Sequence, residues 1–336
     1  MDAILSGSGR RVLEHISVRA FEHPADRAAL GALRALPGFS IVLRALFGLV
    51  GDRSVRYLHL ANAVQVSDKQ LSRVDSIYRE CLEVLDVERR PELFVLHTPV
   101  VNAGALGVDN PFIVLHSASL QLFDDDELRF VLGHELGHVL SGHALYKTTL
   151  GLLLRLSFGY LGLPIASVAL LGVVAALREW DRKSELSADR AGLLAAQCPD
   201  VAYRVHMKLA GGIAAREMNV EAFVAQAADY QRAGGVLDGV LKLVNLLQRT
   251  HPFGVVRLAE LKRWVDSGDY ERVLSGDYVR RSDDESAPLG KELLEGIRSY
   301  QQTYRQSTDP LARFVQELAQ ASGSVLDRAL DRFRQR

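Results

Sequence analysis

The sequence predicts a mainly α-helical protein with a small β-sheet, that is, an α+β fold. Most of the chain shows apolar residues at helical spacing, and only short runs have the composition of strands. With 336 residues, 48% of them hydrophobic, the chain can bury a large core as one elaborated domain or two. The formal net charge of −1 gives no bulk attraction to nucleic acid, so we expect no nucleic-acid partner.

The first third of the chain supplies the predicted sheet and several helices. Apolar residues alternate with arginine up to a break at Pro37-Gly38, and Ser67-Asp68 forms a helix-capping pair. We predict two short amphipathic helices within residues 27–50 and one longer helix at residues 68–85. We predict three strands, at residues 64–66, 93–96 and 112–115.

The next element carries the most informative motif, His134-Glu135-Leu136-Gly137-His138. Apolar residues recur at helical spacing around it, and the aspartates at 124–126 can cap the helix and favour its positive end. On a helix, two histidines four residues apart lie on one face, where both imidazoles reach one zinc ion. The intervening glutamate can then take a proton from a metal-activated water.

A zinc ion held by His134 and His138 needs a third protein ligand. Glu185 and Asp189 lie four residues apart, so a helix presents both on one face. Glu185 can bind the metal, while Asp189 can accept the second N–H of a ligand histidine and fix its orientation. The alternative is a solvated acidic face paired with neighbouring arginines. Small residues around the pair favour close helix packing and therefore the ligand interpretation.

One rival zinc class can be tested on the sequence. The metzincin pattern requires glycine and histidine at positions occupied here by Ser141 and Ala144. His143 is one residue out of place, so we expect it at the end of the helix or behind a ligand rather than on the metal. The class with a glutamate ligand remains.

A long apolar stretch separates the two halves of this site. Residues 156–177 contain no Asp, Glu, Lys or Arg and are long enough to span a bilayer, which takes about 20 apolar residues. A single membrane crossing between His138 and Glu185 is excluded if both bind one ion, because both residues must then lie on the same side of the membrane. A hairpin broken near residues 162–164 remains. We expect it to be buried, to form a homo-oligomer contact through residues 150–177, or to contact a membrane peripherally.

Four segments occur in an order typical of one family. In chain order they are residues 101–105 before the strand at 112–115, residues 134–138, residues 185–189, and residues 250–252 followed by Arg257. Over about residues 55–265 the chain resembles the HtpX and CAAX-prenyl-protease type of zinc metallopeptidase. The resemblance implies a gluzincin zinc-metallopeptidase fold with an apolar helical hairpin inserted between the zinc-ligand helices. We expect an N-terminal helical segment at residues 1–54 and the metallopeptidase domain at residues 55–275. A linker with a helical tail follows at residues 276–336.

The resemblance also implies roles for residues outside the metal motif. Asn102, Ala103 and Ala105 would bind substrate along a free strand edge. Arg257 would also bind substrate, and His251 would assist catalysis in the transition state. From the residues alone, Asn102 and Ala103 are equally a turn into a buried strand, and His251 is a helix-entry residue.

We therefore expect a zinc-dependent endopeptidase with one Zn²⁺ per chain, Glu135 as general base, and protein or peptide substrates. The alternative is a non-proteolytic or latent relative, a chaperone or membrane-associated adaptor with a structural or blocked zinc site. Residues 1–20 lack the apolar run of a secretory signal, and neither of the two cysteines lies in a C-x-x-C pair. We expect a cytoplasmic protein, either free or peripheral at the inner face of the membrane. Substrate, oligomeric state and regulation by the termini stay open.

Overall fold

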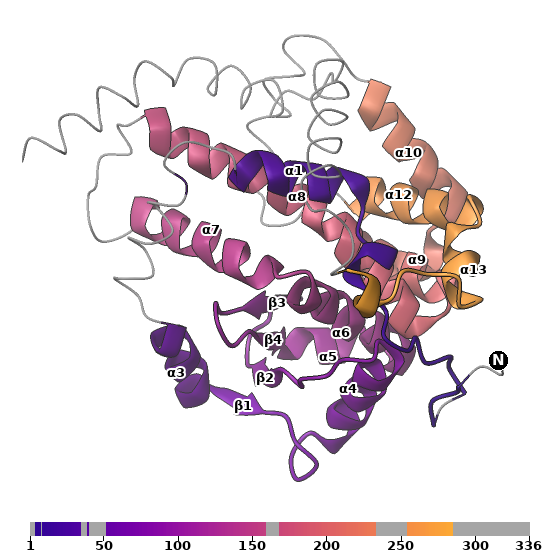
Figure 1. The fold of residues 1–336 in the computed structure, drawn as a ribbon, viewed down its shortest axis with the longest axis horizontal. Helices are drawn as coiled ribbons and strands as arrows, with labels where there is room; N and C mark the ends of the chain where they lie inside the picture. Colours follow the sequence, from indigo (N-terminus) through magenta and orange to yellow (C-terminus); the bar gives the residue numbers. More distant parts are fainter. Residues whose placement is uncertain are drawn as a thin grey trace, which may run out of the picture.

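The computed structural model describes residues 4–7, 9–34, 39, 52–158, 168–232 and 254–284. It confirms the predicted fold class, because helices surround one small sheet (Figure 1). The longer helices are α1 (Pro24–Arg34), α3 (Asp52–Asn62), α4 (Ser72–Val84), α6 (Asp125–Leu140), α7 (His143–Phe158), α8 (Val168–Ala196), α9 (Pro199–Gly211), α10 (Val220–Arg232) and α12 (Gly254–Asp266). The short ones are α5 (Ser117–Leu122), α13 (Asp269–Leu274), η1 (Val18–Ala20), η2 (Gly212–Glu217) and η3 (Arg281–Asp283).

The sheet has four strands, β1 (Ala63–Gln65), β2 (Glu92–Leu96), β3 (Ala103–Leu106) and β4 (Phe112–His116). Their order is β1-β2-β4-β3, with β2 and β4 parallel and the other pairs antiparallel. The strands predicted at 64–66, 93–96 and 112–115 correspond to β1, β2 and β4. The segment around Asn102 leads into β3, which lies at the edge of the sheet next to α6 and α7.

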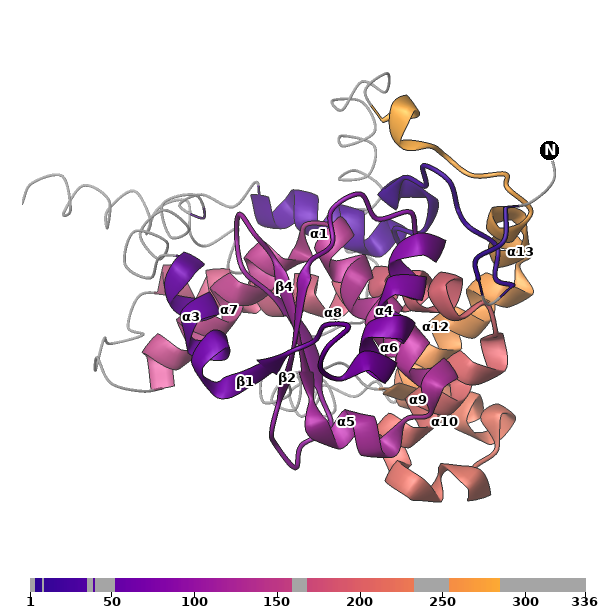
Figure 2. The ribbon, with the colours of Figure 1, turned by 90° about the horizontal axis from the view of Figure 1, so that it is seen from below.

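Alternation along β2 and β4 divides the sheet into two apolar faces. Leu93 and Val95 pair in register with Ile113 and Leu115, and all four join the main core with α4 and α6. The intervening Phe94, Phe112 and Val114 form a second cluster on the other face. Because side chains of a strand alternate between faces, both faces of these two strands are buried. Figure 2 shows α4 and α6 on one side of the sheet and α3 on the other.

The helix predicted from residue 68 begins later than expected. Residues 67–70 form a turn in which Ser67 and Gln70 are bridged, and the Ser67 hydroxyl accepts a hydrogen bond from the Lys69 amide. Leu71 then adopts a left-handed conformation with φ of 58°, and α4 starts at Ser72. Ser67 closes a local turn instead of capping the helix, a competition typical of serine near helix ends.

The apolar interval folds as the arms of α7 and α8, which lie side by side (Figure 1). The second arm and the helix predicted around Glu185 are one continuous helix, α8. Leu150, Leu153 and Leu177 are buried in one cluster with Leu33 of α1. Residues 159–167, which include the predicted break, lie outside the described residues. Within the described ranges, no helix is both long enough and apolar enough to cross a membrane. Oligomer or membrane contact through residues 150–177 stays a prediction.

The N-terminal segment belongs to the same packed body as the metal motif. Leu13, Ile16 and Phe21 lie in the main core, and α1 runs along α8 (Figure 1). His251 and residues 285–336 lie outside the described residues, as does most of the second helix predicted before residue 50. The predicted boundaries at 54 and 275 stay predictions.

Candidate metal centre

Local sequence fixes both ends of α6, the helix that carries the motif. The Asp124 carboxylate accepts a hydrogen bond from the Glu127 amide at 2.9 Å, and the Glu127 carboxylate accepts one from the Asp124 amide at 2.9 Å. This capping box satisfies two of the amides at the start of the helix. Gly142 ends the helix with φ of 67°, a conformation that glycine adopts without strain, and α7 starts at the next residue.

Small residues bring α6 and α8 into close contact. A Cβ atom on Gly137 would lie 2.6 Å from Cβ of Ala191, and one on Gly133 would lie 2.3 Å from Cβ of Ala195. Both distances are shorter than van der Waals contact, so only glycine allows the helices to approach this closely. The motif face of α6 is thereby pressed against the part of α8 that carries Glu185 and Asp189.

At this contact the structure brings His134, His138 and Glu185 together. Nε2 of His134 lies 3.5 Å from one carboxylate oxygen of Glu185, and Nε2 of His138 lies 3.3 Å from the other. One candidate ligand atom from each residue lies within 4.8 Å of the others, and all three residues are buried. Two imidazoles and a carboxylate are the donor set of a catalytic zinc site with a glutamate ligand. The residues present therefore fit a metal ion.

Asp189 lies behind His134. Its carboxylate accepts a hydrogen bond from Nδ1 of His134 at 3.0 Å, which leaves Nε2 directed toward Glu185. Arg257 donates to Asp189 from Nε at 2.8 Å, and Nε2 of His206 lies 3.6 Å from the same carboxylate. Burial alone would raise the pKa of Asp189, but the charges of Arg257 and His206 lower it below its usual range. The carboxylate is therefore ionised and fixes the orientation of the imidazole ring.

A different pair lies behind His138. Nδ1 of His138 lies 3.0 Å from Nδ1 of His143, the first residue of α7. Nε2 of His143 lies 3.1 Å from the carboxylate of Asp26 on α1. The expectation that His143 lies behind a ligand matches this position.

Two cations, the half-buried Lys147 and the buried Arg257, neutralise Glu185. Lys147 donates to it at 2.6 Å and to Asp181 at 2.8 Å, and Arg257 lies 2.9 Å from its other oxygen. Burial raises the pKa of Glu185, but Lys147 and Arg257 outweigh burial and hold that pKa well below its usual range. Glu185 is therefore negatively charged over the physiological range, as a metal ligand must be.

The electrostatic field at the two histidines differs. Burial lowers the pKa of His134, but hydrogen bonds to Asp189 and Glu185 outweigh it and raise that pKa to about 9. Burial and the charge of Lys147 lower the pKa of His138 well below its usual value. A positive charge is thus favoured on the Asp189 side of the site, while His138 stays neutral and able to donate a lone pair.

Glu135 lies in the wall of a cavity of about 340 Å³ next to this group. Burial raises the pKa of its carboxyl group, and its Oε2 has no hydrogen-bond partner among the described residues. The same cavity is lined by His134 and Glu185, by Asn102 and Ala103 at the start of β3, and by apolar side chains, including Phe123, Phe130, Val131, Val205 and Val255. The metal group therefore opens onto a partly apolar cavity beside an edge strand.

The remaining predicted residues are placed differently. Ala105 is buried and does not line this cavity. Arg257 lines the cavity, but its guanidinium is bound to Asp189 and Glu185. His251 lies outside the described residues.

Sequence reasoning missed Asp26 and Lys147. Lys147 had a usable signal, because it lies four residues after His143 and a helix places both on one face. Asp26 had none, because only the packing of α1 against α8 brings it near the motif.

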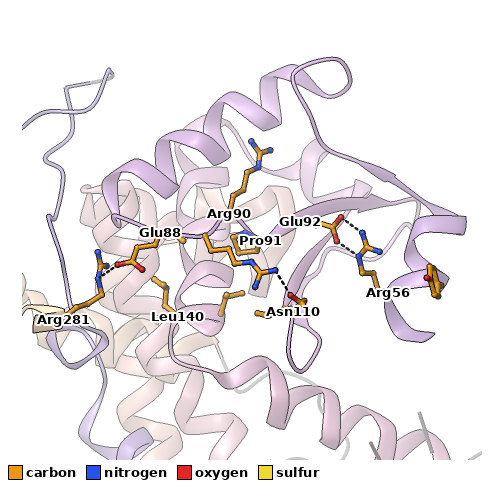
Figure 3. A pocket seen from close by; sticks show the side chains of 13 residues that line it. Arg56, Glu88, Arg90, Pro91, Glu92, Asn110, Leu140 and Arg281 are labelled. Atoms are coloured by element: carbon orange, nitrogen blue, oxygen red, sulfur yellow. Dashed lines mark hydrogen bonds and ion pairs between the residues drawn. The ribbon is translucent and has the colours of Figure 1, made fainter. Parts of the chain in front are cut away.

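A second cavity has a volume of about 920 Å³, and Figure 3 shows the side chains that line it. Several polar side chains in its wall bind one another: Arg56 donates to Glu92 at 2.5 Å, Arg89 donates to Asn110 at 2.6 Å, and Arg281 lies 3.3 Å from Glu88. His134, Glu135, His138 and Glu185 do not line it. We therefore assign the candidate site to the smaller cavity.

The fold and the site define a metal-dependent peptidase of the HExxH type, with a buried His-His-Glu group. The sequence pattern of peptidase family M48 matches residues 68–265. The chain belongs to this family, as the resemblance of its motifs predicted.

Curated relatives agree with this assignment. The chain is 36% identical over 264 residues to the plastoglobule-localized metallopeptidase 48, chloroplastic, of Arabidopsis thaliana, covering 76% of this chain and 74% of that protein. Over 73 residues it is 38% identical to the protease HtpX homolog of Helicobacter pylori strain J99, covering 20% of this chain and 24% of that protein. A protease HtpX homolog of Helicobacter acinonychis is 32% identical over 82 residues. No solved structure matches.

Proposed function

We propose that this protein is a zinc-dependent endopeptidase with one Zn²⁺ held by His134, His138 and Glu185. The observation that carries the proposal is that Nε2 of both histidines converges on the Glu185 carboxylate, beside a cavity that His134, Glu135 and Glu185 line. Nitrogen and carboxylate donors with three protein ligands favour zinc and leave a position for water or substrate. Protein or peptide substrates follow from membership of a peptidase family.

The ion would supply a water of lowered pKa and would polarise the scissile carbonyl. Glu135 takes the proton of the attacking water and delivers it to the leaving amine. The raised pKa of Glu135 suits both steps, because the carboxyl group must gain and then lose the same proton. Asp189 orients His134, and Lys147 and Arg257 hold the Glu185 carboxylate. His251 as a second electrophile stays a prediction from the family resemblance.

Substrate binding is proposed along β3. This strand is paired with β4 on one side and lies at the edge of the sheet, and Asn102 and Ala103 at its start line the cavity with Glu135. An extended peptide can add to such an edge through main-chain hydrogen bonds. The apolar lining of the cavity favours an apolar substrate side chain. Contact by Ala105 or Arg257, and a cytoplasmic location, stay predictions.

Substitution of the general base tests the proposal. Glu135→Gln removes the proton acceptor without changing side-chain size, so we expect zinc content to stay near one per chain while kcat for peptide cleavage falls at least about 100-fold. Glu185→Ala is expected to lose stoichiometric zinc. Glu179→Gln is the matched control, since Glu179 is a buried α8 carboxylate paired with Arg182. It should cleave like the wild type.

Undiminished cleavage by Glu135→Gln contradicts the proposed mechanism. Equal, stoichiometric zinc in wild type and Glu185→Ala removes Glu185 from the site. A wild-type protein that binds zinc and cleaves no peptide favours the non-proteolytic adaptor or chaperone.

A further inference from the structure

The two metal-facing histidines are supported in different ways. His134 is bonded directly to a carboxylate, Asp189, which lies on the same helix as Glu185. His138 is bonded to a third histidine, His143, which in turn faces Asp26 from the N-terminal segment. Asp26 lies outside residues 68–265, to which the family pattern is matched. Asp26, the far end of the second support, therefore comes from a part of the chain that the family pattern does not cover.

His138, His143 and Asp26 form a line that consists of one hydrogen bond and one ion pair. When Nε2 of His138 binds the metal ion of the proposed site, its Nδ1 carries the proton and donates to Nδ1 of His143 over 3.0 Å. Nδ1 of His143 must then be the acceptor, so the proton of that ring is on Nε2, which faces Asp26 at 3.1 Å. A neutral imidazole has one donor and one acceptor nitrogen.

The line is buried and held in place at both ends. Asp26 and His143 are 0% exposed and His138 is 1% exposed. The Ser187 hydroxyl donates to Asp26 at 2.5 Å and accepts from the His23 amide at 2.9 Å, which ties the start of α1 to α8. The ring of His143 also packs edge-on against Trp180, with centroids 5.4 Å apart.

The charge of Asp26 is the reason to assign this line a role at the metal. Asp75, another buried carboxylate, is neutralised by Arg79 and Arg90. Among the described residues, the ion pair made by Asp26 is the one with His143. A buried carboxylate without a cation is costly. A metal ion on His138 would supply the compensating positive charge through the two imidazoles.

We propose that Asp26 and His143 are positioning residues for His138, and that the N-terminal segment completes the metal centre. The inference rests on the proposed zinc site. His143 fixes the tautomer and the ring plane of His138, and Asp26 fixes those of His143. Such partners of metal-bound histidines typically change metal affinity by about 10–100-fold when they are replaced. In this arrangement α1 supports the metal centre.

The experiment uses the full chain with Zn²⁺ alone and Co²⁺ alone as probes. Zinc affinity is measured by competition with a chromophoric chelator, and the ligand geometry is followed by the visible absorption of bound Co²⁺. We expect Asp26→Asn and His143→Leu to bind Zn²⁺ about 10–100-fold more weakly and to alter the Co²⁺ spectrum. His143→Gln should recover part of the affinity lost in His143→Leu, because its amide oxygen can accept from Nδ1 of His138.

Leu33→Ala is the matched control, since Leu33 is also buried on α1 but lies in the apolar cluster with Leu150 and Leu177. It should lower the melting temperature and leave zinc affinity and the Co²⁺ spectrum unchanged. Wild-type affinity and spectrum in folded Asp26→Asn, or an equal loss in Leu33→Ala, would overturn the proposal. If Asp26→Asn does not fold, equal affinities of His143→Gln and His143→Leu overturn it instead. A wild-type chain that binds neither ion refutes the zinc site itself.

Discussion

Buried charge is the dominant feature of individual residues around the His-His-Glu group. Lys147 and Arg257 lie among Asp181, Glu185 and Asp189, and each cation contacts two carboxylates. Such a network is stable only while every member keeps its partners, because an unpaired buried charge costs several kcal/mol. Replacing one residue of the network therefore changes both stability and the charge offered to a metal.

His23 gives a testable pH dependence at this scale. Burial and the charges of Arg190 and Lys183 lower the pKa of His23 to about 3, and its Nδ1 accepts a hydrogen bond from the Ala25 amide at 3.1 Å. Between pH 6.5 and pH 3 the unfolded chain therefore binds a proton that the folded chain refuses, so acidification destabilises the fold. The contribution is about 1.4 kcal/mol per pH unit.

His23→Asn keeps a helix-capping side chain and removes the titration. We expect its free energy of unfolding to fall less steeply on acidification than that of the wild type, measured by urea unfolding from pH 7 to pH 4. Parallel pH profiles for the two proteins would contradict the assignment of a neutral, half-buried His23.

At the scale of elements, the crossing of α6 and α8 determines whether the site forms. Gly133 and Gly137 face Ala195 and Ala191, and Gly192 lies against the backbone of Phe130. These contacts set the distance between the helix that carries the histidines and the helix that carries Glu185. The ends of α6 are fixed by local sequence, but its separation from α8 depends on small residues in both helices.

Gly137→Ala tests this contact. Its new Cβ would lie 2.6 Å from Cβ of Ala191 and 3.2 Å from Cα of Ala188, so the helices must separate. We expect a loss of about 1–3 kcal/mol of unfolding free energy and weaker zinc binding, measured by urea unfolding and chelator competition. Gly151→Ala on α7 is the control, because its Cβ meets nothing within 4 Å. It should gain about 0.5–1 kcal/mol. A stabilised Gly137→Ala would refute the close crossing.

At the scale of the whole molecule, chain segments distant in sequence share one core. Leu13, Ile16 and Phe21 pack with residues of α4, α6, α8, α9 and α12, and Ile16 is bridged to Arg280. The N-terminal segment therefore stabilises the same body that holds the metal group, and it brings Asp26 to His143.

Phe21→Ala tests this contribution, since Phe21 is 1% exposed. We expect a loss of about 3–5 kcal/mol of unfolding free energy in urea, because a large buried ring is replaced by a cavity. Leu5→Ala in the same segment is the control, since Leu5 is 59% exposed, and it should change stability by less than about 0.5 kcal/mol. Similar small losses in both variants would show that the N-terminal segment is not part of the core.

Local patterns in the sequence predicted the parts of the site that lie within one helix or one strand. These features depend on neighbours a few residues away. They are the spacing of His134 and His138 and of Glu185 and Asp189, the caps at 124–126, and the strands at 64–66, 93–96 and 112–115. Such patterns are readable because helix and strand periodicity is local. The start of α4 was misplaced, since Ser67 had two local partners to choose from.

By itself, the sequence determined the family, the fold class and the motif that presents two histidines and a glutamate on one helix. Only the tertiary structure decided which histidine Asp189 supports, and only the tertiary structure brought Lys147 and Asp26 to the site. Asp189 contacts His134 because glycines let α6 and α8 approach each other closely. Lys147 contacts Glu185 because the chain turns at Gly142, between α6 and α7. Asp26 reaches His143 because apolar packing seats α1 on α8. These contacts join residues far apart in the chain, and burial of apolar surface, which carries no local signature, brings them together.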